Sequence, residues 1–327
     1  MYINYANKIQ GSNFITSKNT FTYIMTEFRR NHSAGKGQRK RGFGGFIIRS
    51  VLFVIFLLVL MYMLYSTISK YSGDNADFIE TSPITTESGD RFYLPSGSDG
   101  QLIHHKFYSL AYNEKNEQAD WVAYVLKKDE LKLPNVKRAK RFKPDYDVKT
   151  KSAMHKDYSH SGYTRGHMAP AGDMAFSTEA MQESFLMSNM SPQLKECNSG
   201  IWKELEENVR DWAIDDKELI VVSGPLFTSP TPKKIGKSKV AVPDAFYKIL
   251  LDVTKPEVKG IAFRIPNAKS DRHLKEYAVS IDEIEDETHL DFFNLLLDEE
   301  EQAVLESSFD ISKWRFDNRR FKNRVKN

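Results

Sequence analysis

Residues 163–210 read YTRGHMAPAGDMAFSTEAMQESFLMSNMSPQLKECNSGIWKELEENVR, and this stretch decides the fold. Its final part predicts a helix over residues 199–212, because apolar residues recur there at helical spacing and would face a core. These apolar residues are Ile201, Leu205, Val209 and Trp212. A second row with a spacing of four residues consists of Asn198, Trp202, Glu206 and Arg210. Polar groups beside a buried stripe are costly unless they are paired or bind a ligand, so this row is a candidate functional site.

Upstream of this helix, Arg165, Gly166 and His167 place a guanidinium and an imidazole on either side of a glycine. Glycine permits close approach of the backbone to a ligand. Histidine can accept a proton from water, and arginine can donate two hydrogen bonds to a phosphate. The pattern alone is only a weak indication of phosphate chemistry, and a hydrogen-bonded structural histidine is the alternative interpretation.

The remainder of the chain predicts both strands and helices. Strands are expected at residues 121–126, 219–223, 246–253 and 260–265, and the run LIVVS at 219–223 is typical of a buried strand. Further helices are expected at residues 178–187, 281–287 and 298–307, and Ser280 with Glu283 predicts a capping box. Because strands and helices do not alternate regularly, we expect an α+β domain with a mixed, mostly antiparallel sheet and flanking helices.

The charge of the chain is distributed unevenly. The chain has 327 residues with a formal net charge of +3, but residues 1–50 hold nine of the 47 Lys and Arg and one of the 44 Asp and Glu. The remainder is therefore acidic, at −5. A polyanion would have to bind through a local basic patch or a metal ion rather than through bulk charge. A single cysteine, Cys197, excludes an intrachain disulfide and leaves the compartment open.

Residues 50–68, SVLFVIFLLVLMYMLYSTI, carry no charge and would reach roughly 28 Å as a helix, which is close to the thickness of a bilayer core. They predict a transmembrane signal-anchor helix, with a cleaved signal peptide and a buried core helix as alternatives. The basic residues just before it predict a cytoplasmic N-terminus and an exported C-terminal domain, facing a periplasm or the exterior. The expected organisation is a basic cytoplasmic segment at 1–49, the anchor at 50–68, a linker at 69–100 and the main domain at 101–327.

Three charged segments stand out. Residues 282–301 hold ten acids and no Lys or Arg, and residues 315–326 hold six bases and one acid. We interpret both as solvated surface. Residues 137–143, KRAKRFK, combine five bases with a phenylalanine and suit a loop that contacts phosphates.

The motifs of the central stretch resemble those of the non-specific DNA/RNA endonuclease family. The family pattern Asp-Arg-Gly-His with Leu/Met-Ala-Pro-Ala corresponds to residues 164–171, TRGHMAPA. The family segments Ser-Asn-x-x-Pro-Gln and Asn-x-x-x-Trp-x-x-Leu-Glu correspond to residues 188–193 and 198–206. Further similarity includes Ser223-Gly224-Pro225 and the run PDAFYK at residues 243–248, and the resemblance covers roughly residues 104–314.

This resemblance implies the ββα-metal (His-Me finger) fold, in which a strand delivers the histidine and the following helix delivers a metal-binding asparagine. It implies that His167 is the general base and that Asn198 is the single direct protein ligand of a Mg²⁺ ion, with Mn²⁺ or another divalent cation as alternatives. Glu206 would hold water molecules of the ion, and Asn189 and Gln193 would orient those waters. Arg210 and Arg165 would contact the phosphate. A family arginine of the approach loop corresponds best to Arg141, with Arg138 and Lys140 as alternatives.

The implied function is that of a metal-dependent, sugar-non-specific endonuclease, which cleaves DNA and RNA and leaves 5′-phosphates. With histidine as the base, the rate of cleavage is expected to rise with pH near the ordinary histidine pKa of about 6.5. One residue departs from the family pattern, since Thr164 replaces the usual Asp of the first motif. The alternatives are therefore a catalytically weakened nucleic-acid-binding module at the membrane and a metal phosphodiesterase of smaller substrates. The resemblance leaves a homodimer open, because many family members are dimers and the sequence gives no interface signal.

Overall fold

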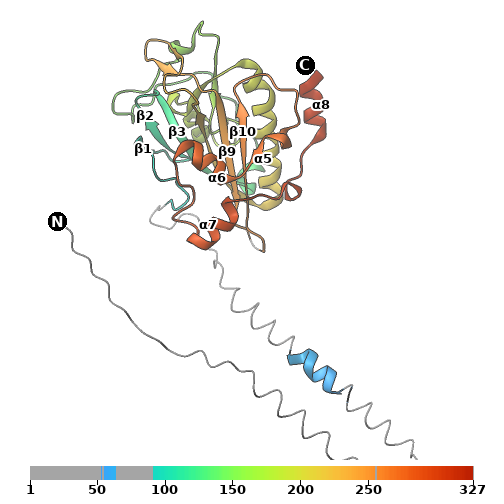
Figure 1. Cartoon of the computed structure of the whole chain (residues 1–327). Coiled ribbons are helices and arrows are strands. Elements are labelled where there is room, and N and C mark those ends of the chain that lie inside the picture. Colours follow the sequence, from blue (N-terminus) through green and yellow to red (C-terminus); the bar gives the residue numbers. More distant parts are fainter. Residues whose placement is uncertain (1–52, 54, 64–90, 255, 327) are drawn as a thin grey trace, which may run out of the picture. The chain divides into compact units, whose positions relative to one another are not determined.

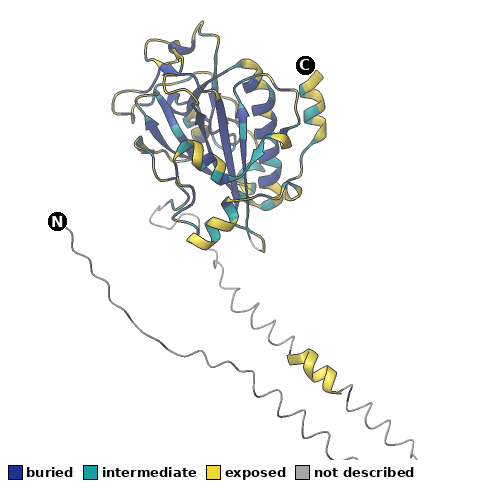
Figure 2. Cartoon of the chain, viewed as in Figure 1, coloured by how far each residue is buried: buried dark blue, intermediate teal, exposed yellow. Residues whose placement is uncertain are grey.

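The computed structural model describes residues 53, 55–63, 91–254 and 256–326. The chain divides into two compact units, residues 1–80 and 81–327. In the first unit, residues 53 and 55–63 are helical with exposed side chains (Figure 2). Residues 50–52, 54 and 64–68 of the expected anchor, and all of residues 1–49 and 69–90, lie outside the described residues. Within the described part, no helix has the length and apolarity needed to span a membrane.

A seven-stranded sheet forms the centre of the second unit, in the order β1-β2-β3-β6-β9-β10-β11 (Figure 1). The strands are β1 (Gln101–His104), β2 (Ser109–Asn113), β3 (Gln118–Lys127), β6 (Glu218–Leu226), β9 (Ala245–Asp252), β10 (Lys259–Pro266) and β11 (Ala278–Val279). All neighbouring strands in this sheet are antiparallel. The four predicted strands are thus confirmed as β3, β6, β9 and β10, and the predicted α+β class is confirmed with them.

The sheet is buried on both faces, because successive residues of its central strands alternate between two apolar cores. On one face, Val221 and Phe263 pack with the apolar stripe of α5 (Trp202–Asp216). On the other face, Ile220 and Val222 pack with α6 (Ile281–Thr288). This two-sided burial explains why β6 and β9 read as nearly continuous apolar runs.

Helix α6 is followed by α7 (Glu299–Glu306), and both predicted helices are confirmed. Ser280 caps α6 by accepting a hydrogen bond from the Glu283 amide, which is one half of the predicted capping box. Asp298 caps α7 in the same way. Glu306, the last residue of α7, is buried, and that burial raises the pKa of its carboxyl to about 8.

Shorter elements connect these layers. They are α3 (Lys128–Leu131), η1 (His155–Tyr158), α4 (Thr178–Glu183), η2 (Met187–Asn189), η4 (Leu274–Tyr277), η5 (Ile311–Lys313) and the β7–β8 pair (Lys234–Ile235 and Val240–Ala241). The predicted helix over 178–187 is therefore too long. It ends at Glu183 because the backbone of Phe185 and Met187 pairs with Lys143 instead, in two hydrogen bonds of 3.1 and 2.8 Å.

The basic C-terminal run is not simply solvated surface, as the sequence suggested. It forms α8 (Asn318–Lys326), which packs against the outer side of α5. Arg320 Nη1 bonds to Asp211 at 2.6 Å, and Arg324 Nε bonds to Glu204 at 2.6 Å in a pair that is almost fully buried. The bases of residues 315–326 thus neutralise acidic side chains of α5, and sequence alone does not reveal this pairing across more than 100 residues.

Candidate active site

Two short strands and the helix that follows them form a ββα unit. β4 (Thr164–His167) pairs antiparallel with β5 (Met190–Gln193), and η3 (Cys197–Ile201) leads directly into α5. The Nε1 of Trp202 donates to the His167 carbonyl at 3.2 Å, and the Nδ2 of Asn198 donates to the Thr164 hydroxyl at 2.8 Å. The start of the helix is therefore bonded to both ends of β4. The predicted base and the predicted metal ligand belong to one compact unit.

The amide of Asn198 has a defined orientation. The Thr164 hydroxyl has a single proton, which it donates to the Gln193 carbonyl at 2.9 Å. It must therefore accept a hydrogen bond from Asn198, so the NH₂ group of that amide faces Thr164. The carbonyl oxygen, Oδ1, is left as the atom that can bind a metal ion.

His167 lies in an apolar setting with only 8% of its surface exposed. Its ring contacts those of Phe142 and Phe185, with centroid distances of 5.9 and 5.0 Å. Burial lowers the pKa of His167 to about 3, and the positive charge of Arg138 adds to that shift. The imidazole is thus neutral over the whole range from pH 5 to 8. Burial thus argues against a rise of the rate near pH 6.5 from this ring alone, and the sequence does not reveal how deeply the ring is buried.

Gln193 lies directly against Gly166. A Cβ atom at residue 166 would come within 2.1 Å of the Gln193 side-chain oxygen, so only glycine fits at this point of β4. Gln193 is fully buried, and both polar atoms of its amide lack a hydrogen-bond partner among the described residues. The Nε2 of His167 also lacks a partner. Unpaired buried polar atoms are rare in proteins, and their presence here fits a unit that receives polar ligands.

Asn189 is bonded to the backbone through both atoms of its amide. Its amide nitrogen donates to the carbonyls of Ala169 and Ser184, both at 2.9 Å, and its side-chain oxygen accepts from the Ala169 amide at 2.8 Å. Both donor hydrogens are thus used by backbone, and the side chain is fully buried. Asn189 thus fixes the backbone that follows His167, and its role in orienting waters of an ion stays a prediction. The sequence motif marks the residue but not its partners.

A buried network of charges underlies the polar side of α5. Arg210 bonds to Asp173 at 2.7 Å, and Tyr124 donates to the other oxygen of Asp173 at 2.7 Å. Burial raises the pKa of Glu206, and the charges of Lys248 and Arg210 oppose that shift. Burial likewise lowers the pKa of Lys248. Arg210 is thus held by Asp173, and the charges of Lys248 and Arg210 act on Glu206.

Lys248 itself lies on β9 opposite Ser223 of β6, to which its Nζ donates at 2.5 Å. The same Nζ lies 4.9 Å from the ring centroid of Trp202. Sequence reasoning quoted the runs that contain Asp173, Ser223 and Lys248 but assigned these residues no role. A lysine inside an otherwise apolar strand was the available signal.

The basic loop at 137–143 borders the site. Arg138, Lys140 and Arg141 are all exposed, and the guanidinium of Arg138 lies 5.0 Å from the ring centroid of Phe185. The charge of Arg138 also acts on both His167 and Glu206. Of the three alternatives, Arg138 is thus the one whose charge reaches two predicted site residues. Arg141, which the sequence favoured, is not among the charges that act on the pKa of His167 or Glu206.

Phe142 lies between the site and a neighbouring cavity of about 710 Å³. The guanidinium of Arg165 lies 5.0 Å from the Phe142 ring centroid, and His155 stacks on the same ring at 5.9 Å. Lys156 and Lys237 are among the other lining residues. The cavity thus combines an aromatic wall with cationic side chains, a combination that suits nucleic acid.

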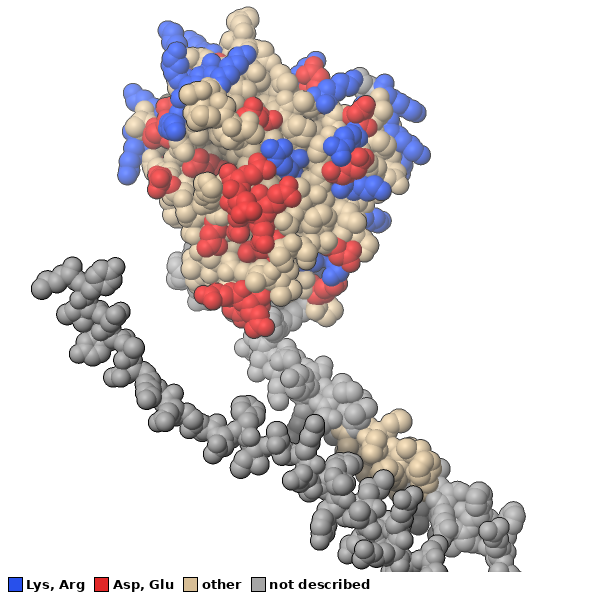
Figure 3. Space-filling view, viewed as in Figure 1, with Lys and Arg blue, Asp and Glu red and all other residues tan. Residues whose placement is uncertain are grey.

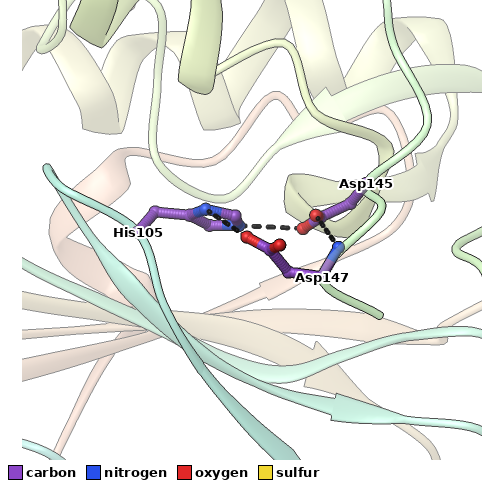
Figure 4. Close-up of side chains that lie close together, drawn as sticks. All are labelled: His105, Asp145 and Asp147. Atoms are coloured by element: carbon purple, nitrogen blue, oxygen red, sulfur yellow. Dashed lines mark hydrogen bonds and ion pairs between the residues drawn. The ribbon is translucent and has the colours of Figure 1, made fainter. Parts of the chain in front are cut away.

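A second polar cluster consists of His105, Asp145 and Asp147, and its two aspartates follow the basic loop at 137–143 (Figure 4). The Nε2 of His105 lies 2.8 Å from Asp145, and its Nδ1 lies 3.7 Å from Asp147. Ser188 donates to the same Asp145 oxygen at 2.5 Å. Burial lowers the pKa of His105, but hydrogen bonding to Asp145 and the nearby carboxylates outweigh it, so the net pKa is raised. We interpret this cluster as a buried ion pair, because both ring nitrogens already face carboxylates.

The described residues contain two groups of three or more His, Cys, Asp or Glu side chains that could hold a metal ion. They are the His105 cluster and the group of Asp282, Glu285 and Glu306. Neither contains a predicted site residue. Within the ββα unit, the Oδ1 of Asn198 is the oxygen that could hold a metal ion. Oxygen donors of this kind are those that Mg²⁺ prefers.

Comparisons with known proteins agree with this geometry. Residues 88–299 match the family described as DNA/RNA non-specific endonuclease. The chain is 37% identical over 235 residues to the mitochondrial nuclease EXOG of Xenopus laevis, covering 65% of this chain and 64% of that protein. It is 35% identical over 211 residues to a nuclease of Nostoc sp., covering 60% and 74%, and 32% identical over 198 residues to human mitochondrial endonuclease G, covering 57% and 67%.

The EXOG proteins are longer than the matched region, since the chain spans 64% of the Xenopus laevis and Danio rerio proteins and 55% of the Mus musculus protein. A crystal structure of a complex of EndoG with EndoGI, which concerns EndoG inhibition, superposes with a TM-score of 0.59 at 28% identity. That match covers 63% of this chain and 90% of the other. The mixed α+β arrangement described above is therefore that of an endonuclease G structure.

The His105 cluster leads to a pH-dependent prediction. The raised pKa of His105 means that the ion pair stabilises the fold fully below the unfolded pKa of about 6.5, and that this contribution is lost as pH rises through the folded pKa. We expect Asp145→Asn to lower the free energy of unfolding by about 3 kcal/mol at pH 6 and by less at pH 9. Urea denaturation at both pH values measures this free energy.

The control Asp147→Asn, at an exposed carboxylate, should change the free energy of unfolding by less than about 1 kcal/mol. An equal loss at both pH values for Asp145→Asn would contradict the assignment.

Proposed function

The chain belongs to the DNA/RNA non-specific endonuclease family, and we propose that it hydrolyses phosphodiester bonds in both DNA and RNA, in the presence of a divalent metal ion, and leaves 5′-phosphates. The observation that carries this proposal is the bonding of one helix start to both ends of β4. It brings the neutral imidazole of His167 and the oriented amide oxygen of Asn198 into one unit. A phosphodiester approached from this side would meet a proton acceptor and a metal ligand together.

His167 would accept a proton from the attacking water. General base catalysis of this kind contributes about 10²–10⁴-fold. Burial keeps the ring neutral and therefore able to accept the proton. The negative charge of a bound phosphate would favour the imidazolium that results. The hydrogen bonds of Asn189 to Ala169 hold the backbone beyond His167 in place while this happens.

Asn198 would hold the ion through Oδ1, and Glu206 and Gln193 would bind its water molecules. Mg²⁺, or Mn²⁺ in its place, would supply Lewis-acid stabilisation of the charge that develops on the phosphate. Arg210 would contact a phosphate oxygen while Asp173 fixes its guanidinium. Arg165 and Arg138 would hold neighbouring phosphates, since each lies over an aromatic ring beside His167.

The substrate would extend along the basic loop at 137–143 and the cavity beside Phe142. Lys140 and Arg141 are exposed and would add phosphate contacts that do not depend on base sequence. His155, which is exposed and stacks on Phe142, would offer a ring on which any base can stack. Such contacts do not require a 2′-hydroxyl, which is the reason to propose cleavage of both polymers.

We expect His167→Ala to slow the nicking of plasmid DNA and the cleavage of RNA by roughly 10²-fold or more in the presence of Mg²⁺. Excess EDTA should abolish cleavage by the wild-type chain. The matched control is His104→Ala, which removes an exposed histidine of β1 and should leave the rate within about twofold. Near wild-type turnover by His167→Ala, or cleavage without a divalent ion, would rule out this mechanism. Mononucleotide esters as the only substrates cleaved would favour the phosphodiesterase alternative.

A prediction at Thr164 tests whether this residue preserves or weakens the site. Thr164→Val keeps the shape but removes the hydroxyl that orients Asn198, so the apparent affinity for Mg²⁺ should fall by about tenfold or more. Thr164→Ser retains the hydroxyl and should behave like the wild type. The Mg²⁺ concentration for half-maximal cleavage and the binding of Mn²⁺ without substrate, followed by electron paramagnetic resonance, measure this effect. Identical metal binding by the Val and Ser variants would remove Thr164 from this role.

We also propose that residues 50–68 anchor the chain in a membrane, with residues 1–49 cytoplasmic and the nuclease domain exported. The support is the uncharged 19-residue run and the basic residues before it. The full-length chain should therefore remain with the membrane fraction after an alkaline carbonate wash, and protease added to intact cells or spheroplasts should digest the domain. Full release by carbonate, or a domain that only lysis exposes, would contradict this orientation.

A further inference from the structure

The acidic segment at 282–301 is not used by the proposed catalytic site. Its side chains gather over α6 and α7 on one face of the domain (Figure 3). These helices cover the face of the sheet opposite to α5. Any role of this surface is therefore separate from the ββα unit.

Three carboxylates of this region converge. Asp282 and Glu285 lie one helical turn apart on α6, Glu306 ends α7, and one ligand oxygen from each lies within 4.8 Å of the other two. Two oxygens that bind the same Ca²⁺ ion at about 2.4 Å can be at most about 4.8 Å apart. The three oxygens are thus close enough to share one ion.

Glu306 is the unusual member of this group. It is 4% exposed, and its Oε1 has no hydrogen-bond partner among the described residues. It also ends a helix, where the partial negative charge of the helix dipole disfavours a carboxylate. Burial of its charge is expensive, so Glu306 holds a proton near neutral pH unless a cation takes the place of that proton.

Among the residues that the structure describes, no cationic side chain supplies that compensation. In the described parts of the chain, Asp282, Glu285 and Glu306 take part in no ion pair, and the one recorded for α6 joins Arg264 to Glu287. The charges that reach Glu306 come from other carboxylates, namely Glu285, Asp282 and Asp291. The unpaired oxygen of Glu306 therefore faces an acidic surrounding that attracts a cation.

We propose that Asp282, Glu285 and Glu306 form a binding site for a Ca²⁺ ion that joins the end of α7 to the start of α6. The donors are all carboxylate oxygens, which suits a hard cation and not Zn²⁺, for which His or Cys ligands are typical. Ca²⁺ tolerates irregular geometry and fills its remaining positions with water, whereas Mg²⁺ demands a near-ideal octahedron. The exposure of Asp282 leaves the site open to solvent on one side.

Calcium titration of the full-length chain tests this site. We would use the Asn198→Ala background, stripped of metal with EDTA and dialysed, so that the proposed catalytic ion does not contribute. Isothermal titration calorimetry with CaCl₂ should show one binding event with a dissociation constant of roughly 10⁻⁴–10⁻³ M, and the unfolding temperature should rise with Ca²⁺ concentration. The absence of both effects would overturn the proposal.

Substitutions then assign the ligands. Glu306→Gln removes the buried charge at nearly constant shape and should weaken Ca²⁺ binding at least about tenfold. Asp282→Asn changes a partly exposed residue, so it should fold normally and should also weaken binding. The matched control Glu300→Gln removes an exposed carboxylate from the same helix α7 and should bind Ca²⁺ like the parent chain. Unchanged binding in Glu306→Gln and Asp282→Asn, or the same loss in all three variants, would refute a site at these residues.

Discussion

The bonding of the α5 start to β4 is the interaction on which the rest of the site depends. A strand of four residues has little stability by itself, and here it is held by β5 on one edge and by two side chains of the helix. Asn198 bonds at the first residue of the strand, and Trp202 bonds at the last. The position of the proposed base and the orientation of the proposed metal ligand thus follow from the same two hydrogen bonds. The bond of Trp202 holds the backbone of His167, and the bond of Asn198 orients its amide.

The charges beneath this unit carry a cost that the fold must offset. Asp173, Glu206, Arg210 and Lys248 are removed from most of the solvent, and burying charges is favourable only when geometry pairs them well. The structure meets this requirement with neutral donors as well as ions, since Tyr124 and Ser223 each bond to a charged group. Such an arrangement contributes little net stability but keeps Glu206 and Arg210 at fixed positions. Functional sites often contain unfavourable interactions, and the free energy of the surrounding core offsets them.

The sequence predicts the sheet and the functional helix well, because both depend on local patterns. The apolar runs of β6 and β9 reflect burial on two faces, and the two stripes of α5 separate its core side from its polar side. Motifs also identified residues without revealing their partners. For Asn189 the motif does not reveal the backbone partner 20 residues away, and for His167 it does not reveal the burial that lowers the pKa of the ring. Both have one cause, since hydrogen bonds and desolvation between distant segments leave no periodic signal.

The single cysteine of the chain lies at the start of η3, next to Asn198, and is completely buried. That burial raises the pKa of its thiol to about 12. Oxidants and disulfides react with the thiolate form, which is therefore almost absent at neutral pH. The segment that carries the proposed metal ligand is thus protected from sulfenic acid formation and from mixed disulfides. A lone thiol in this position would keep its chemistry unchanged in reducing and in oxidising surroundings alike.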